Sequence, residues 1–432
     1  MKNFQIILIT VFIVLAVVGV LVFSGMIPLG EKKNEEGSGG TVVLWGTVSS
    51  SSLSKAIENF NHDNNVYVLQ YVQKREDSFD KDLLEALASG KGPDIFIVPE
   101  NLIYKYSNKI LPIPYESFPL ASFQQIFISP SEVFLTSKGA LAFPLSVDPL
   151  MMYYNRAFLN SSNIINPPST WKELSEMVPV LNFKDESGKL IKTTVALGHF
   201  SNIENAKYIL TGMFMQVGTP IVVENNGVFL PNLVSSLNSS NNENVLNTYT
   251  SFADPFKENY SWNKSMPNSK DAFTSGSTAF YFGFASELKS LIERNPNLNL
   301  MVAPMPQMDN LQNKITSGEI NGLAVSVFSQ NRDSAFLVAN LLSKSDFAKE
   351  FASATGTIPI RKDLLISDKS NQFETAFYTS ALFTRGWIDP SPKESYAIFK
   401  DVIEGILSNT LNLSSVIREI DSKLNLLFDK NI

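Results

Sequence analysis

The chain of 432 residues contains no cysteine and only two histidines, His62 and His199. The absence of cysteine excludes disulfide bonds and thiolate metal sites, and two isolated histidines argue against a zinc or iron centre. Basic residues are also scarce, since 35 lysines and arginines stand against 42 aspartates and glutamates, a formal net charge of −7. Because phosphate binding requires clustered basic side chains, this balance argues against a nucleic-acid partner.

The sequence also lacks the common signatures of hydrolytic and phosphate-binding sites. It has no Gly-x-Ser-x-Gly elbow, no His-Glu-x-x-His motif and no cysteine–histidine nucleophile pair. The glycine-containing run at residues 89–92 lacks the Gly-x-x-x-x-Gly-Lys spacing of a phosphate loop and precedes a predicted strand instead of a helix. We therefore predict no cofactor and no metal.

The first 24 residues contain a long uncharged segment. Residues 6–23 are almost wholly aliphatic, and about 20 such residues in a helix span the core of a bilayer. A signal peptide has a shorter apolar region that ends in a small-residue cleavage site. We therefore predict an uncleaved N-terminal transmembrane anchor at residues 1–24, in preference to a cleaved signal, and a flexible polar linker at residues 25–40.

The rest of the chain is long enough for two domains. Residues 41–98 alternate three apolar, strand-like runs with two amphipathic, helix-like runs, which predicts an α/β fold with a parallel sheet covered by helices on both faces. In such open sheets ligands bind beyond the carboxyl ends of the strands. The polar residues that follow the first and third strands are therefore candidate ligand contacts, with ordinary solvated loop positions as the alternative: Thr47, Ser49, Glu100 and Asn101.

A single carboxylate, Asp148, interrupts the apolar residues 141–158. A charge between two buried strands costs free energy unless another group pairs with it. Pro149 removes a backbone donor and favours an extended conformation at Asp148. This combination suits a segment that crosses from one domain to the other between two strands and directs a polar group into the space between them. A strand with a turn and a solvated aspartate is the alternative.

Three tryptophans can be separated by their context. Trp171 shares one face of a predicted helix with Leu174 and Val178, so we predict that it packs in a core. Trp262 and Trp387 lie in polar, irregular segments that offer an indole no helical or strand face. We therefore predict that both rings are exposed and stack on a ligand, with local packing of each loop as the alternative.

From Thr41 to its end the chain resembles the extracellular solute-binding proteins of ABC transporters, in particular the maltose- and oligosaccharide-binding type. The resemblance implies that Asp148 hydrogen-bonds a sugar hydroxyl and that an aromatic residue near Trp387 stacks on the sugar. Many relatives have a tryptophan where Phe284 and its neighbours stand, so Phe284 is either a replacement platform or a core residue. The segments that carry the resemblance are Gly-Lys-Gly-Pro-Asp-Ile-Phe at 90–96, the crossing around Asp148, Phe-Thr-Ser-Gly-Ser-Thr-Ala at 273–279 and Gly-Thr-Ile-Pro-Ile-Arg at 356–361.

The resemblance further implies a two-lobed fold of the periplasmic-binding-protein type, with a hinge made of three crossings between the lobes. We predict that lobe 1 comprises residues 41–146 and 322–380, and lobe 2 residues 147–321 and 381–432. The ligand would lie between the lobes, and closure about the hinge would enclose it.

The implied function is capture of a small solute, a sugar or oligosaccharide, outside the cell membrane for import through ABC permease subunits. Two alternatives stay open at this point. One is a membrane-anchored carbohydrate-active enzyme, in which Glu100 and Asp148 would form the carboxylate pair, about 5–5.5 Å apart, of a retaining glycosidase. The other is a ligand-binding sensor component that does not transport.

Overall fold

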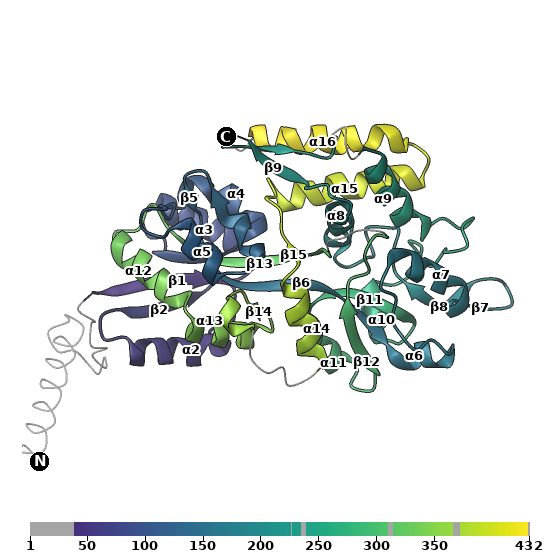
Figure 1. The fold of residues 1–432 in the computed structure, drawn as a ribbon, viewed down its shortest axis with the longest axis horizontal. Helices are drawn as coiled ribbons and strands as arrows, with labels where there is room; N and C mark the ends of the chain where they lie inside the picture. Colours follow the sequence, from purple (N-terminus) through teal and green to yellow (C-terminus); the bar gives the residue numbers. More distant parts are fainter. Residues whose placement is uncertain (1–38, 226, 235–238, 310–313, 366–371, 431–432) are drawn as a thin grey trace, which may run out of the picture.

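The computed structural model describes residues 39–225, 227–234, 239–309, 314–365 and 372–430. Its elements form two groups on either side of the middle of one mixed sheet (Figure 1), whose strand order is β2-β1-β3-β13-β6-β11-β8-β7. At one end of the sheet β1 (Thr41–Gly46) runs parallel to β2 (Val68–Gln73) and to β3 (Ile95–Pro99). The parallel arrangement predicted for residues 41–98 is therefore confirmed.

Two long antiparallel strands connect the two groups. β6 runs from Phe143 to Asn155, and β13 runs from Thr316 to Val325. β13 pairs with the first half of β6, whereas the second half of β6 pairs with β11 (Thr278–Phe284) and β12 (Leu300–Pro304). The third connection is the short strand β15 (Thr384–Arg385), which pairs with the start of β13. The chain therefore passes through the middle of the sheet at three places.

The expectation that two separate strands flank Asp148 and Pro149 is wrong, because both residues lie inside β6. Asp148 is paired with Glu319, and Pro149 is paired with Gly318. A Cβ atom at position 318 would lie 2.5 Å from the carbonyl oxygen of Asp148 and 3.0 Å from the Cα atom of Pro149. Only glycine lets β13 approach this closely, so the pairing of the two strands extends as far as the proline.

This close approach gives a test of the crossing. Gly318→Ala is expected to lower the free energy of unfolding by about 1–3 kcal/mol, because the new methyl group overlaps backbone atoms that have no room to withdraw. Urea denaturation of the variant beside the wild type measures the change. A variant with unchanged stability would show that the two strands can move apart without cost.

Helices cover the sheet on both sides of its middle. Beside β1, β2 and β3 lie α2 (Ser50–Asp63), α3 (Phe79–Ala88), α4 (Ile103–Tyr106), α5 (Leu120–Ile126), α12 (Arg332–Leu342) and α13 (Ser345–Thr355), with the short strands β4 (Leu135–Thr136), β5 (Gly139–Ala140) and β14 (Ile358–Pro359). Beside β11 and β12 lie α6 (Arg156–Ser161), α7 (Trp171–Leu181), α8 (Ala206–Gln216), α10 (Ser269–Thr274), α11 (Leu288–Arg294) and α14 (Gln372–Ala381), with β7 (Phe183–Lys184) and β8 (Leu190–Val195). The upper layer in Figure 1 contains α9 (Ser239–Ser251), α15 (Pro392–Leu407), α16 (Leu413–Lys430) and the hairpin of β9 (Val222–Asn225) and β10 (Val228–Pro231).

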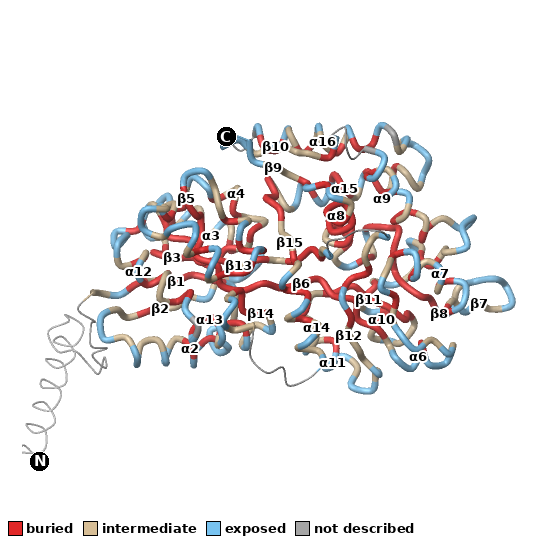
Figure 2. Tube along the Cα trace, in the orientation of Figure 1, coloured by how far each residue is buried: buried red, intermediate tan, exposed pale blue. Residues whose placement is uncertain are grey.

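The buried apolar side chains form two clusters that meet at β6, where the buried trace of Figure 2 is continuous. Val147 and Tyr153 point into the first cluster, and Leu150 and Met152 into the second, because successive side chains of a strand point to opposite faces. The division of the chain at residues 146, 321 and 380 stays a prediction.

The predicted anchor, residues 1–24, and most of the predicted linker lie outside the described residues. Among the helices that the structure does describe, none combines the length and the apolar character needed to cross a bilayer.

Candidate functional site

Two acidic residues face each other where β6 and β13 pair in the middle of the sheet. Asp148 on β6 and Glu319 on β13 are directly paired, so their side chains share one face of the sheet. Asp148 is 5% exposed, and Glu319 is half-buried. Val147 and Ile320 point to the opposite face and pack in the first apolar cluster. The alternation of the strand therefore sends the apolar residues into the core and the carboxyl groups away from it.

Asp148 is held by the segment that follows β11. The backbone N–H of Ser286 donates a hydrogen bond to Asp148 Oδ1 at 3.1 Å. Burial raises the pKa of Asp148 to about 7, and the hydrogen bonds with Ser286 oppose this rise. The Asp148 carboxyl therefore titrates near neutral pH.

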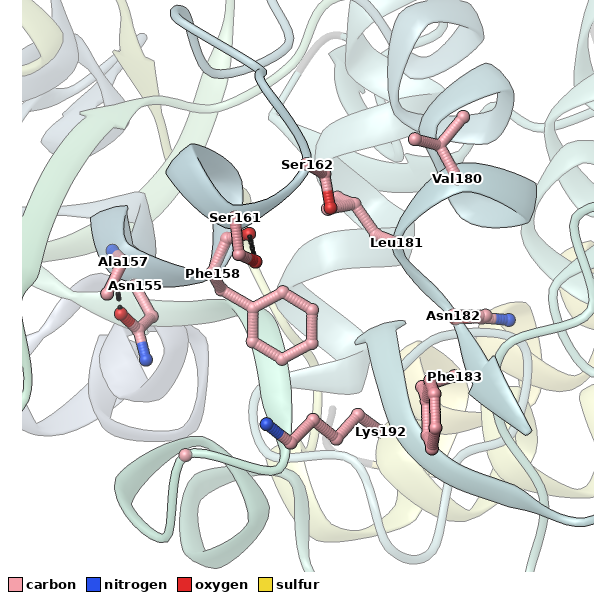
Figure 3. Close-up of a pocket in the computed structure, with 11 residues that line it drawn as sticks. Asn155, Ala157, Phe158, Ser161, Ser162, Val180, Leu181, Asn182, Phe183 and Lys192 are labelled. Atoms are coloured by element: carbon pink, nitrogen blue, oxygen red, sulfur yellow. Dashed lines mark hydrogen bonds between the residues drawn. The ribbon is translucent and has the colours of Figure 1, made fainter. Parts of the chain in front are cut away.

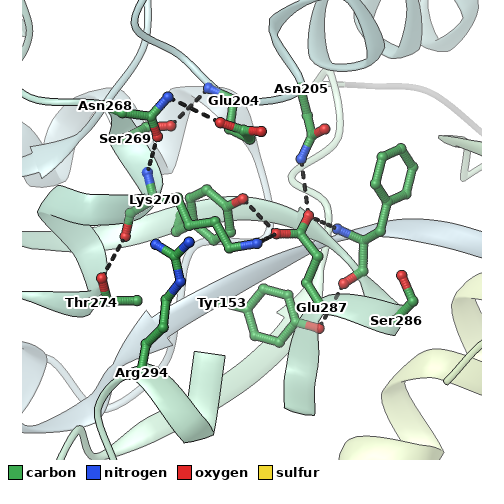
Figure 4. A network of polar contacts seen from close by, with 12 residues as sticks. Tyr153, Glu204, Asn205, Asn268, Ser269, Lys270, Thr274, Ser286, Glu287 and Arg294 are labelled. Carbon is green, nitrogen blue, oxygen red and sulfur yellow. Dashed lines mark hydrogen bonds and ion pairs between the residues drawn. The ribbon is translucent and has the colours of Figure 1, made fainter. Parts of the chain in front are cut away.

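Glu287 fixes the position of this segment (Figure 4). Its carboxylate accepts hydrogen bonds from Phe284 N–H at 2.8 Å, Asn205 Nδ2 at 3.1 Å and the Tyr281 hydroxyl at 2.8 Å, and it forms an ion pair with Lys270 at 2.7 Å. A carboxylate with its acceptor positions filled in this way restrains the turn around it. Ser286 is therefore presented to Asp148 by a firmly held loop.

Glu100 lies at the carboxyl end of β3, as the sheet argument predicted. It is 1% exposed, and its Oε2 atom accepts a hydrogen bond from the backbone N–H of Ile320 at 2.7 Å. Burial, followed by the charge of Glu319, raises the pKa of Glu100 well above its ordinary value. Gly386 in the third connection packs against it, since a Cβ atom there would lie 2.7 Å from Glu100 Cγ. Glu100 therefore contacts two of the three connections.

Tyr208 on α8 joins the next residue, Asn101, to the crossing. Asn101 Nδ2 donates a hydrogen bond to the Tyr208 hydroxyl at 2.9 Å, and that hydroxyl donates to Glu319 Oε1 at 2.9 Å. Burial raises the pKa of Glu319, and the hydrogen bond from Tyr208 opposes this rise. The ring of Phe284 meets the ring of Tyr208 edge-on, with centroids 4.9 Å apart. We call Glu100, Asn101, Asp148, Tyr208, Ser286 and Glu319 the crossing cluster.

A buried ion pair lies next to the crossing cluster. Lys207 Nζ is 2.8 Å from Asp389 Oδ2, and their side chains are 9% and 1% exposed. The same ammonium lies 5.9 Å from the ring centroid of Trp387 and 6.0 Å from that of Tyr208. Trp387 is therefore near the cluster, but it is 7% exposed and packs in the second apolar cluster. The prediction that its ring is exposed is wrong, while its role toward a ligand stays a prediction.

The structure separates the other three candidates from the cluster. Trp262 is 2% exposed and lies in the second apolar cluster, so the expected exposure of its ring is wrong: the irregular segment folds its indole inward. Ser49 caps α2, where its Oγ accepts a hydrogen bond from the N–H of Ser52 at 3.1 Å. Thr47 is exposed. Among the contacts of the described residues, none joins Thr47, Ser49 or Trp262 to the crossing cluster.

Sequence reasoning missed Tyr208, Ser286 and Glu319. Glu319 lies close to the lobe boundary predicted at residues 321 and 322, so the argument applied to Asp148, a charge among strand residues, could have found it. Tyr208 follows Lys207 in an otherwise apolar helix, which is the same signal. Nothing in the sequence singles out Ser286, because it contributes a backbone N–H.

A separate pocket of about 460 Å³ lies between α6, α7 and the β7–β8 hairpin (Figure 3). It is lined by apolar groups such as Phe158, Leu181 and Phe183, and Lys192 Nζ lies 5.7 Å from the ring centroid of Phe158. None of its lining residues belongs to the crossing cluster. We therefore place the candidate site at the crossing and not in this pocket.

The chain was compared with known proteins. A model of the bacterial extracellular solute-binding proteins matches residues 55–376. Similar solved structures include a cyclo/maltodextrin-binding protein complexed with maltotetraose (17% identity, TM-score 0.72, covering 91% of this chain and 98% of that one) and the sugar-binding protein MalE from Xanthomonas citri (15%, 0.72, 90% and 98%). A third is the cyclic α-maltosyl-1,6-maltose binding protein from Arthrobacter globiformis (14%, 0.69, 90% and 99%).

At these identities the solved structures show a shared fold. The curated proteins that were compared include no match. The family model covers well over half of the chain. This protein belongs to the family of bacterial extracellular solute-binding proteins.

Proposed function

We propose that this protein is a membrane-tethered extracellular receptor that captures a sugar or oligosaccharide for import by an ABC transporter. The observation that carries the proposal is the convergence of polar groups from both halves of the molecule on the crossing. Glu100 and Asn101 come from the first half, Tyr208 and the backbone N–H of Ser286 from the second, and Asp148 and Glu319 from the strands between them. Carboxylates and amides take sugar hydroxyls, while aromatic rings pack on the apolar face of a sugar. Relatives with this fold were solved with maltotetraose and maltotriose.

Closure of the two lobes about the three connections would enclose the solute. The solute shifts the balance between open and closed forms by its preference for the closed form. Permease subunits would then recognise the closed form, and the N-terminal anchor would keep the receptor near them at a high effective concentration. The same closure would serve a sensor, and uptake of labelled sugar by cells with and without the gene separates transport from sensing.

Hydrolysis of the solute fits the carboxyl groups poorly. A retaining glycosidase needs one carboxylate that stays ionised and one carboxylic acid, with their pKa values pushed apart by their surroundings. Burial raises the pKa of Glu100, Asp148 and Glu319 alike, and no cation of the described residues forms an ion pair with any of them. We therefore propose a binding protein without catalytic activity.

Calorimetric titration of the full-length chain with maltotriose and cellotriose tests this function. The detergent should have no sugar headgroup, which would compete for the site. We expect at least one sugar to bind without release of shorter products, and Asp148→Asn to weaken binding about tenfold to hundredfold, because one charge-assisted hydrogen bond is lost.

Glu176→Gln is the matched control, because Glu176 lies on α7 and is 65% exposed. Its affinity should equal that of the wild type. Release of glucose or of shorter oligosaccharides during the titration would indicate an enzyme. Equal affinities for Asp148→Asn and the wild type would remove Asp148 from the site.

A further inference from the structure

The crossing cluster contains three carboxyl groups and no cation. Glu100 and Asp148 each accept a hydrogen bond from a backbone N–H, and Glu319 accepts one from the Tyr208 hydroxyl. Within the described part of the chain none of the three forms an ion pair. Like charges placed directly opposite each other on a sheet, as Asp148 and Glu319 are, destabilise the sheet. The carboxyl groups of the cluster therefore lack an ion-pair partner, although the nearby charge of Lys207 lowers the pKa of Glu100 and Glu319 against the larger effect of burial.

Several cations of the described residues are already engaged with other groups. Lys207 is paired with Asp389, and Lys270 is paired with Glu287. Lys74 lies over the ring of Trp45, with Nζ 3.6 Å from the ring centroid. Arg385 on β15 forms no ion pair with another described residue, and it donates a hydrogen bond to the Thr384 carbonyl oxygen at 2.7 Å. An anionic solute at the crossing would nevertheless meet three carboxyl groups that no ion pair of the described residues neutralises. It would also have to give up its hydration to enter a largely buried site, which is costly for an unpaired charge.

A second observation indicates that a polar group is missing from this face. Ser146 lies two residues before Asp148 on β6, on the same face of the strand, and it is fully buried. Its Oγ atom has no hydrogen-bond partner in the structure. Buried hydroxyl groups are nearly always satisfied, so this one requires an explanation. A donor bound beside Asp148 would supply it with a partner.

From this geometry we infer that the solute carries a positively charged amine as well as hydroxyl groups, as an oligosaccharide of glucosamine does. This inference rests on the proposed function and specifies its substrate class. The ammonium group would donate charge-assisted hydrogen bonds to Asp148 and Glu319. The ring of Tyr208 offers an aromatic surface of the kind that cations and sugar rings both contact. Sugars that carry a carboxylate or a phosphate are excluded by the same charges.

Titration with matched trisaccharides tests the inference on the full-length chain. The probes are cellotriose, the β-1,4-linked trimers of glucosamine and of glucuronic acid, and spermidine as an amine without a sugar. We expect the glucosamine trimer to bind at least tenfold more tightly than cellotriose, and the glucuronic acid trimer not to bind. Glu319→Gln should abolish most of this preference. Because Glu319 also holds Tyr208 in place, Asp148→Asn serves as a second variant in which the ratio of the two affinities is measured. Glu176→Gln should keep the preference.

Each outcome decides between the two proposals. If cellotriose or maltotriose binds as tightly as the glucosamine trimer, the charge inference is wrong and the proposed function stands. If spermidine binds and no sugar does, the solute is a cation and the proposed sugar function is wrong. If none of the probes binds, both fail.

Discussion

Lys207→Met is expected to lower the free energy of unfolding by about 3–5 kcal/mol, because it leaves Asp389 buried without its counter-charge. The Asp389 side chain is 1% exposed, so water cannot replace the ammonium group. Asp389 keeps the hydrogen bonds from the Ser395 hydroxyl at 2.7 Å and from the Ser391 backbone N–H at 3.0 Å, but neither donor carries the positive charge that would balance the carboxylate. Urea denaturation followed by circular dichroism measures the loss.

Two further variants sharpen this test. Lys172→Met removes a cation that lies 3.9 Å from Glu176 on the surface of α7 and is 69% exposed, so it should change stability by less than about 1 kcal/mol. The double variant Lys207→Met with Asp389→Leu should recover most of the stability, because no lone charge remains. A loss below about 1 kcal/mol for Lys207→Met alone would mean that water or another group reaches Asp389.

Raising the pH from 5 to 7 is expected to destabilise the ligand-free protein through Asp148. Its pKa is about 7 in the folded state, against 3.8 as the ordinary value, so between these values the folded state holds a proton that the unfolded state has lost. Stability therefore falls as pH rises, by about 1.4 kcal/mol per pH unit from this group, and levels off above its folded pKa. Glu100 and Glu319, whose pKa values are also raised by burial, act in the same direction.

Asp148→Asn isolates the contribution of Asp148. Burial lowers the pKa of His199, so this residue has the opposite effect below about pH 6.5 and reduces the slope of the wild type. Because both proteins contain His199, its contribution cancels when the two free energies of unfolding are subtracted. The free energy of unfolding of the variant, relative to that of the wild type, should rise by about 1.4 kcal/mol per pH unit between pH 5 and 7. A difference that does not vary with pH would show that Asp148 is ionised throughout this range.

The sequence predicted the parts of the fold that depend on local periodicity. The alternation of strands and helices at residues 41–98 and the burial of Trp171 are both present in the structure. The Trp171 indole N–H finds a buried partner in Gln216 at 2.8 Å, and Thr170 caps the helix that carries Trp171. Each of these features is determined within a few residues or by one apolar face.

The candidate site was predictable only in part, because its contacts join residues that are far apart in the chain. Glu100 and Asp148 stand out as carboxylates at the ends or in the middle of apolar strands. The link from Asn101 through Tyr208 to Glu319 depends on how α8 packs on β13, where the Ser317 hydroxyl donates to the Tyr208 carbonyl oxygen at 2.6 Å. Trp262 was predicted to be exposed because its segment is polar and irregular, yet its ring is buried in a core. A polar segment can therefore still place one large side chain in a core.

The position of Asp148 within β6 has a mechanical consequence. If the lobes rotate about the strands that connect them, as we propose, this carboxyl group lies close to the axis of rotation and moves little. Residues at the edge of each lobe, far from the axis, move much further. A solute could then engage Asp148 while the receptor is still open, and the later contacts would form as the rims arrive. Early and late contacts would therefore be separable in time, the first governing the rate of capture and the others the rate of escape.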